Sequence, residues 1–191
     1  MVKTHSSMLP LGTVAPKFCL QDVITGGLVS LDDKHAHQAT VVMFICNHCP
    51  FVKHILSGII SVATHYASQP VRWIAINAND ITQYPDDAPA QMKSIAEALQ
   101  FPFPYLFDET QEVAQAYHAT CTPDFFVFDH KLHLVYRGQF DDARPGNSVP
   151  VTGESIQHAL ACLLAGQAID GAQKPSLGCN IKWKEGQEPL N

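Results

Sequence analysis

Short apolar runs and helical periodicities alternate along this chain, and the clearest change from one to the other comes early. Residues 41–45 form a continuous run of β-branched, aromatic and other apolar types, which is typical of a strand buried on both faces. From Pro50 onward, apolar residues recur at helical spacing through Ala63, with polar residues on the opposite face. The pattern predicts a strand that runs directly into a helix, with residues 46–49 at the junction.

The alternation continues through the rest of the chain and indicates an α/β fold. Residues 71–76 are expected to form the next buried strand, so that strand, helix and strand make a βαβ unit with a right-handed crossover. The polar residues 77–87 follow at the carboxyl end of that strand, where ligands and reactive groups gather in open α/β sheets. The other expected elements are a hairpin at 17–20 and 28–31, helices at 88–100, 111–118 and 153–165, a short strand ending at 107, and a hairpin at 125–128 and 132–138. In the first hairpin, Cys19 is expected to be a small apolar filler.

Composition places the chain among ordinary globular proteins. It has 191 residues, of which 46% are hydrophobic and 16% charged, and this suits a single domain over 1–191 with residues 166–191 as a tail packed on it. The formal charge of -6 gives no electrostatic footprint for nucleic acid or an anionic membrane. The beginning of the sequence lacks the apolar core of a signal peptide, and no apolar run is long enough to span a bilayer. A cytoplasmic protein is therefore expected, in which the six cysteines are mostly reduced and any disulfide is transient and catalytic.

The junction sequence Cys46-Asn47-His48-Cys49 carries the strongest chemical signal. Unpaired N–H groups and the macrodipole at a helix N-terminus favour the thiolate form of a nearby cysteine. We expect Cys46 to be the exposed nucleophile and Cys49, one turn further into the helix, to be its resolving partner. His48 either adds positive charge beside Cys46 or simply caps the helix. The alternative for the pair is a buried or metal-holding role, but a CxxC between a buried strand and an amphipathic helix favours redox chemistry.

A second informative stretch, residues 120–129, contains Cys121, Thr122 and Pro123 directly before an expected strand. Cys121 is open to three interpretations. It is a small filler of a tight loop, a third redox thiol, or a member of a soft tetrahedral zinc or copper(I) site with Cys46, Cys49 and His48. Cys179 can join these thiols only if the tail folds back over the site.

Several longer segments together resemble the thioredoxin superfamily, and more narrowly the redoxin-type, peroxiredoxin-like (AhpC/TSA-like) bacterial proteins described as thiol-disulfide isomerase/thioredoxin. The segments are CNHCPFVK at 46–53, CTPDFFVFD at 121–129, YRGQFDDARPGN at 136–147 and GCNIKWK at 178–184. The resemblance implies a thioredoxin-like fold, with a central mixed β-sheet flanked by helices and an N-terminal β-hairpin extension. It also implies that Pro123 is a cis-proline facing the CxxC pair, and that the Thr122 backbone offers hydrogen bonds to a substrate chain beside Cys46.

These observations predict a thiol-disulfide oxidoreductase in which Cys46 attacks a substrate disulfide and Cys49 resolves the mixed disulfide. Asn47, His48, Cys121, Thr122 and Pro123 are the expected supporting residues. The reaction needs no organic cofactor, and its partners are a protein or small-molecule disulfide or dithiol and a cellular thiol reductant. Oligomeric state does not follow from the sequence.

Two alternatives stay open at this point. One is a thiol peroxidase, although Met43 stands where the peroxiredoxin signature has threonine or serine relative to Cys46. The other, outside enzymes, is a copper- or zinc-binding module that uses Cys46, Cys49 and Cys121.

Overall fold

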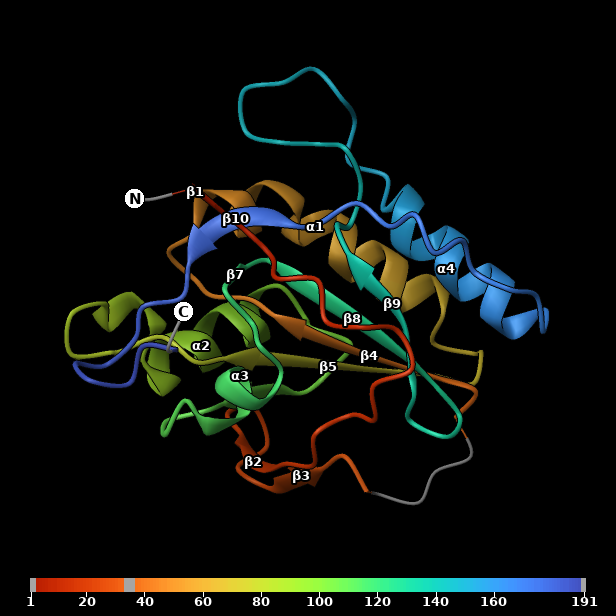
Figure 1. Ribbon diagram of the computed structural model, residues 1–191. Helices are drawn as coiled ribbons and strands as arrows, with labels where there is room; N and C mark the ends of the chain where they lie inside the picture. The colour runs from red at the N-terminus through yellow and green to blue at the C-terminus, as the bar shows by residue number, and fades with distance from the viewer. Residues whose placement is uncertain (1–2, 33–36, 190–191) are drawn as a thin grey trace.

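The computed structural model describes residues 3–32 and 37–189, and these residues adopt an α/β, thioredoxin-like fold (Figure 1). Seven of the described strands form one mixed sheet in the order β3-β2-β6-β5-β4-β8-β9. Their bounds are β2 Cys19–Asp22, β3 Leu28–Ser30, β4 Ala39–Phe44, β5 Val71–Asn77, β6 Tyr105–Phe107, β8 Asp124–Asp129 and β9 Leu134–Gly138.

The centre of the sheet is the strand that leads into the CxxC motif. Every residue of β4 is buried, and β4 pairs in parallel with β5 and antiparallel with β8. A strand with neighbours on both sides and cores on both faces has no polar face, which explains the continuous apolar run. The prediction of a buried strand here, followed by a βαβ unit, is confirmed.

Helices cover both faces of this sheet. Three of them, α1 Pro50–His65, α2 Pro89–Ala98 and α4 Glu154–Leu164, share a hydrophobic core with one face, and α3 Glu112–Ala116 packs on the other. The helix α1 begins at Pro50. Proline has no backbone N–H, but in the first turn of a helix this costs no intrahelical hydrogen bond. None of the helices in the described ranges combines the length and the hydrophobicity that a bilayer crossing requires.

The N-terminal hairpin formed by β2 and β3 is also confirmed, at the edge of the sheet beside β6. Cys19, which the sequence suggested as a small core residue, is instead exposed. Side chains alternate between faces along a strand, so Cys19 points to solvent together with Gln21 while Asp22 is buried.

A second, smaller sheet joins segments from the two ends of the chain. It has the order β1-β10-β7, with β1 Lys3–His5, β10 Leu177–Asn180 and β7 Cys121–Thr122, and all its pairings are antiparallel. Figure 1 shows β10, in blue, beside β1 and next to the beginning of α1. The sequence predicted neither β1, which is short and polar, nor a strand in the tail. Through this sheet the tail reaches the neighbourhood of the CxxC motif.

Candidate active site

The two cysteines of the motif lie where β4 gives way to α1, and Cys49 is the N-cap residue of that helix. Both are buried, with exposed fractions of 2% for Cys46 and 0% for Cys49. The prediction of an exposed Cys46 is therefore wrong. The segment at Thr122 explains the burial, because Cys46 Sγ lies 3.2 Å from the Thr122 hydroxyl oxygen and Cys49 Sγ lies 3.2 Å from the Thr122 carbonyl oxygen.

The Thr122–Pro123 peptide bond is cis, as the resemblance implied. The backbone of Thr122, however, is not open to an incoming chain, because it pairs with Cys179 of β10. The approach is very close. A Cβ atom built on Gly178 would lie 2.0 Å from the Thr122 carbonyl oxygen, so only glycine fits at this position. The edge that the sequence assigned to a substrate chain is occupied by the protein's own tail.

This arrangement brings a third sulfur to the pair. Cys179 Sγ lies 2.9 Å from Cys49 Sγ, and Cys179 is 2% exposed. The tail therefore folds back over the site, which is what Cys179 needs in order to join the other thiols. The six cysteines, all within the described ranges, form no disulfide bond.

The three sulfurs share protons unequally. Hydrogen bonds from the Cys46 thiol, from Cys179 and from the backbone N–H of Val52 together lower the pKa of Cys49 to about 5, against the effect of burial. Burial, the bond to Cys49 and the nearby Asp87 carboxylate together raise the pKa of Cys46 well above its ordinary value. Burial and the bond to Cys49 raise the pKa of Cys179 to about 12.

The negative charge of the reduced centre therefore lies on Cys49, whereas the sequence predicted it on Cys46. When Cys49 is protonated instead, its thiol can donate to the Thr122 carbonyl oxygen. Because the sulfurs are in contact, the titration steps belong to the cluster as a whole.

Asp87, which the sequence analysis did not single out, organises the loop between the cysteines. It lies in the short 3-10 helix η1, Pro85–Asp87, and is completely buried. Its carboxylate accepts hydrogen bonds from the backbone N–H groups of Asn47 and His48, at 2.7 and 3.3 Å, and from the Asn79 side chain at 2.8 Å. Burial raises the pKa of Asp87, but the hydrogen bonds from His48 and Asn79 outweigh it and leave the pKa below its ordinary value. The one available signal was the position of residues 77–87 at the carboxyl end of β5.

His48 does not cap the helix, but a nitrogen of its ring lies within 4.8 Å of the Cys46 sulfur. Its Nδ1 lies 2.5 Å from the Asp87 carboxylate, and its ring stacks on Tyr84 at a centroid distance of 4.8 Å. The cap position of the helix belongs to Cys49. Asn47 is fixed from two sides, because its amide donates to the Asp86 carbonyl and accepts from the Tyr105 hydroxyl.

Cys121 precedes Thr122 in β7, but its sulfur contacts Pro123 instead of the two cysteines of the motif. Its buried sulfur lies 3.7 Å from the Pro123 carbonyl oxygen. In the part of the chain that the structure describes, only one group of three side chains could together ligate a metal ion. It consists of Cys46, His48 and Asp87, whose ligand atoms lie within 4.8 Å of one another. Cys46, Cys49 and Cys121, the ligands of the metal-binding alternative, do not form such a group.

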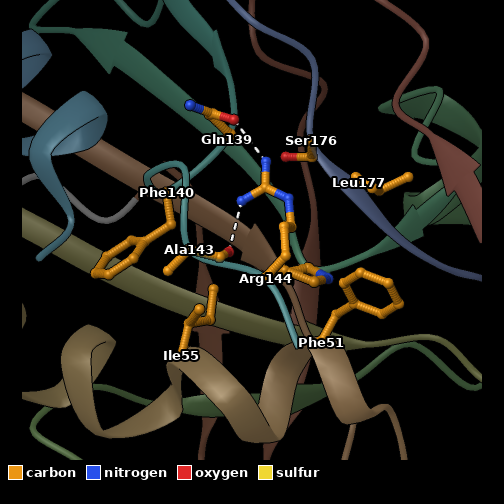
Figure 2. Close-up of a pocket in the computed structure, with 9 residues that line it drawn as sticks. Phe51, Ile55, Gln139, Phe140, Ala143, Arg144, Ser176 and Leu177 are labelled. Atoms are coloured by element: carbon orange, nitrogen blue, oxygen red, sulfur yellow. Dashed lines mark hydrogen bonds between the residues drawn. The ribbon is translucent and has the colours of Figure 1, made fainter. Parts of the chain in front are cut away.

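A pocket opens beside Pro123 and is lined by Phe51 and Ile55 of α1 (Figure 2). In Figure 2 the Arg144 guanidinium lies in the middle of the pocket and donates to the Gln139 side chain at 2.5 Å and to the Ala143 carbonyl at 2.7 Å. The other lining residues, mostly apolar, are Phe51, Ile55, Phe140, Ser176 and Leu177. A largely apolar surface with a cation at its centre thus adjoins the cis-proline.

Comparison with known proteins shows the family of this chain. The AhpC/TSA family matches residues 11–137, which is more than half of the chain, and the chain belongs to that family. This membership supports a redox function in general terms. The comparison with curated proteins found no match.

Two solved structures are similar over nearly the whole chain. A conserved protein from Geobacillus kaustophilus, described as uncharacterized, is 56% identical, with a TM-score of 0.95 over 97% of this chain and 98% of that one. A hypothetical protein from Sinorhizobium meliloti 1021 is 44% identical, with a TM-score of 0.93 over 96% and 100% of the two chains. The peroxidoxin BcpB from Mycobacterium tuberculosis, at 18% identity and a TM-score of 0.62 over 84% and 100%, shares the fold.

Proposed function

We propose that this protein is a thiol-disulfide oxidoreductase whose redox pair is Cys46 and Cys49. The observation that carries the proposal is the position of the two sulfurs at a strand-helix junction, each 3.2 Å from an oxygen of Thr122, the residue before the cis-proline. The pKa of Cys49, lowered to about 5, supports it. A thiolate is the reactive form of cysteine. A centre that holds one thiolate and one thiol in contact has what disulfide exchange requires.

Cys46 is the sulfur that attacks the substrate. Cys49 is enclosed by Cys46, Cys179 and the Thr122 carbonyl, whereas Cys46 retains a slight exposure. As Cys46 attacks one sulfur of a substrate disulfide, its proton passes along the hydrogen bond to Cys49. The Cys46–substrate bond forms, the substrate S–S bond breaks, and the other half of the substrate leaves as a thiolate.

Cys49 then completes the reaction. Its sulfur attacks Cys46 in the mixed disulfide, the Cys46–Cys49 bond forms, and the second half of the substrate leaves with the proton from Cys49. The substrate disulfide has gained two electrons and the pair has lost two. A cellular dithiol that runs the same steps in reverse returns the pair to its reduced form.

The pocket beside Pro123 limits how the substrate binds. With a cavity volume of about 10 Å³, it has room for roughly one water molecule, so it does not admit an apolar side chain. We therefore propose as the substrate a peptide or small-molecule disulfide that lies against the surface beside Pro123 and leaves this pocket unfilled.

A thiol peroxidase is the second candidate, and membership of the AhpC/TSA family favours it. In that reaction a thiolate attacks peroxide and passes through a sulfenic acid. Met43, which stands in place of a hydroxyl residue, is completely buried in β4. Brief treatment with dilute peroxide in the presence of a sulfenic-acid trap separates the two candidates. Oxidation of Cys46 or Cys49 no faster than that of free cysteine would exclude the peroxidase.

Turnover of a disulfide tests the main proposal. With oxidised glutathione as substrate and dithiothreitol as reductant, the wild-type protein should accelerate reduction, and both Cys46→Ser and Cys49→Ser should abolish the acceleration. Cys162→Ser is the matched control, because Cys162 is a buried cysteine on α4 whose sulfur contacts His158 rather than the pair. Equal activity in Cys46→Ser and Cys162→Ser would contradict the proposal.

A further inference from the structure

The reaction proposed above uses two sulfurs, but three are in contact. The Cys49 and Cys179 sulfurs lie 2.9 Å apart, and a disulfide bond measures about 2.05 Å. Both residues are buried, so no solvent separates them. Cys49 is thus in contact with Cys46 on one side and with Cys179 on the other.

The backbone holds Cys179 firmly in this position. Strand β10 lies between β1 and β7, and Cys179 is opposite Lys3 on one side and Thr122 on the other. The preceding residue, Gly178, lies directly against the Thr122–Pro123 peptide. A strand paired on both edges cannot shift easily, so the contact between the sulfurs is part of the fold.

We propose that Cys179 is a third redox-active thiol, which exchanges a disulfide with the Cys46–Cys49 pair through Cys49. The inference rests on the proposed function, because it begins from the oxidised pair. In the step, the Cys179 sulfur attacks Cys49 in the Cys46–Cys49 disulfide. The Cys49–Cys179 bond forms, the Cys46–Cys49 bond breaks, and Cys46 leaves with the electron pair of the broken bond.

The proton balance of the step also fits the site. Cys179 starts as a thiol, because burial raises its pKa. Its proton ends on Cys46, whose pKa is likewise raised by burial. No oxidant or reductant is consumed, since one disulfide replaces another. The product is an oxidised protein in which Cys46, the sulfur that meets the substrate, is again a thiol.

Disulfide mapping tests this directly. The wild-type protein is oxidised with oxidised glutathione, quenched in acid, alkylated, digested and analysed by mass spectrometry. Two alternative bonds are expected, Cys46–Cys49 and Cys49–Cys179, each in a separate fraction of the molecules. In Cys46→Ser, all of the intramolecular disulfide should be Cys49–Cys179. In Cys179→Ser, all of it should be Cys46–Cys49, and Cys162→Ser should match the wild type.

The outcomes separate this inference from the proposed function. A wild-type protein that reduces oxidised glutathione but yields only the Cys46–Cys49 bond would overturn the inference alone. A protein that fails to reduce any disulfide would overturn the proposed function, whichever bond it forms. Circular dichroism of each serine variant confirms that it is folded, and the wild-type map does not depend on any substitution.

Discussion

The carboxylate of Asp87 lies 2.5 Å from Nδ1 of His48, a residue of the loop between the two cysteines of the CxxC motif. Asp87 is completely buried and also accepts hydrogen bonds from the backbone N–H groups of Asn47 and His48. It holds this loop in place and, as a nearby negative charge, opposes a second one on Cys46.

Replacing this carboxylate should change both stability and titration. In Asp87→Asn the charged acceptor is lost, so the free energy of unfolding should fall by about 1–3 kcal/mol. The pKa of Cys46 should fall as well, because the Asp87 charge contributes to raising it. Urea unfolding and the ultraviolet absorbance of the thiolate check the two effects. Asp86→Asn, which changes an exposed neighbour, should do neither, and an unaltered thiolate titration in Asp87→Asn would contradict this role.

A methyl group on Gly178 should separate β10 from the cis-proline segment. The added Cβ would lie 2.0 Å from the Thr122 carbonyl oxygen and 2.5 Å from its carbonyl carbon. Overpacking of this kind costs about 1–3 kcal/mol, and Gly178→Ala should also reduce the Cys49–Cys179 disulfide found by mapping. Gly171→Ala is the control, since its Cβ would meet nothing within 4 Å. Equal stability of the two variants would show that the strand contact is looser than described.

The stability of the reduced protein should depend on pH through Cys49. Its pKa is about 5 in the folded protein against an ordinary value of 9. Between these values the unfolded chain binds more protons, so the free energy of unfolding rises with pH, by at most about 1.4 kcal/mol per pH unit. This contribution is complete above pH 9 and is lost as the pH falls through 5. Above pH 9 the raised pKa values of Cys46 and Cys179 should make stability decline.

Denaturant unfolding of the reduced wild type and of Cys49→Ser across this range measures the effect. The difference between the two proteins should grow with pH from 5 to 9. Parallel curves would mean that Cys49 keeps its proton in the folded protein.

A buried ion pair that includes Asp124, the residue after the cis-proline, should matter for the stability of the fold and not for the redox reaction. Arg137 donates to the Asp124 carboxylate at 3.2 Å, and both side chains are inaccessible to solvent. Removing one member leaves an unpaired buried charge, so Arg137→Met should destabilise the protein by about 3–5 kcal/mol. Lys174→Met, which breaks the exposed pair with Asp142, should have little effect. Thermal unfolding compares them, and similar melting temperatures would contradict the importance of the buried pair.

Local patterns predicted the fold well because its central elements are locally determined. The buried run at β4 and the periodic helix that begins at Pro50 lie where the sequence indicated. Cys19 was assigned wrongly, because strand alternation fixes which residues share a face and leaves open which face is covered.

The surroundings of the site were harder to predict because they depend on contacts between distant parts of the chain. Asp87 reaches the motif from a polar segment after β5, and Cys179 reaches it through a strand close to the C-terminal end. The burial of Cys46 has the same origin, since Thr122 covers it. The residue spacing within the CxxC motif does not predict these contacts with Asp87, Cys179 and Thr122.

Trapping the mixed disulfide distinguishes the attacking sulfur, Cys46, from the resolving one, Cys49. Cys49→Ser is incubated for an extended time at alkaline pH with oxidised glutathione and no reductant, because this variant lacks the Cys49 thiolate that takes the Cys46 proton, and the adduct is located by mass spectrometry. A stable glutathione mixed disulfide on Cys46 is expected, which wild-type protein does not accumulate. A Cys49→Ser protein that forms no adduct on Cys46, or a wild type that accumulates the same adduct, would contradict this assignment.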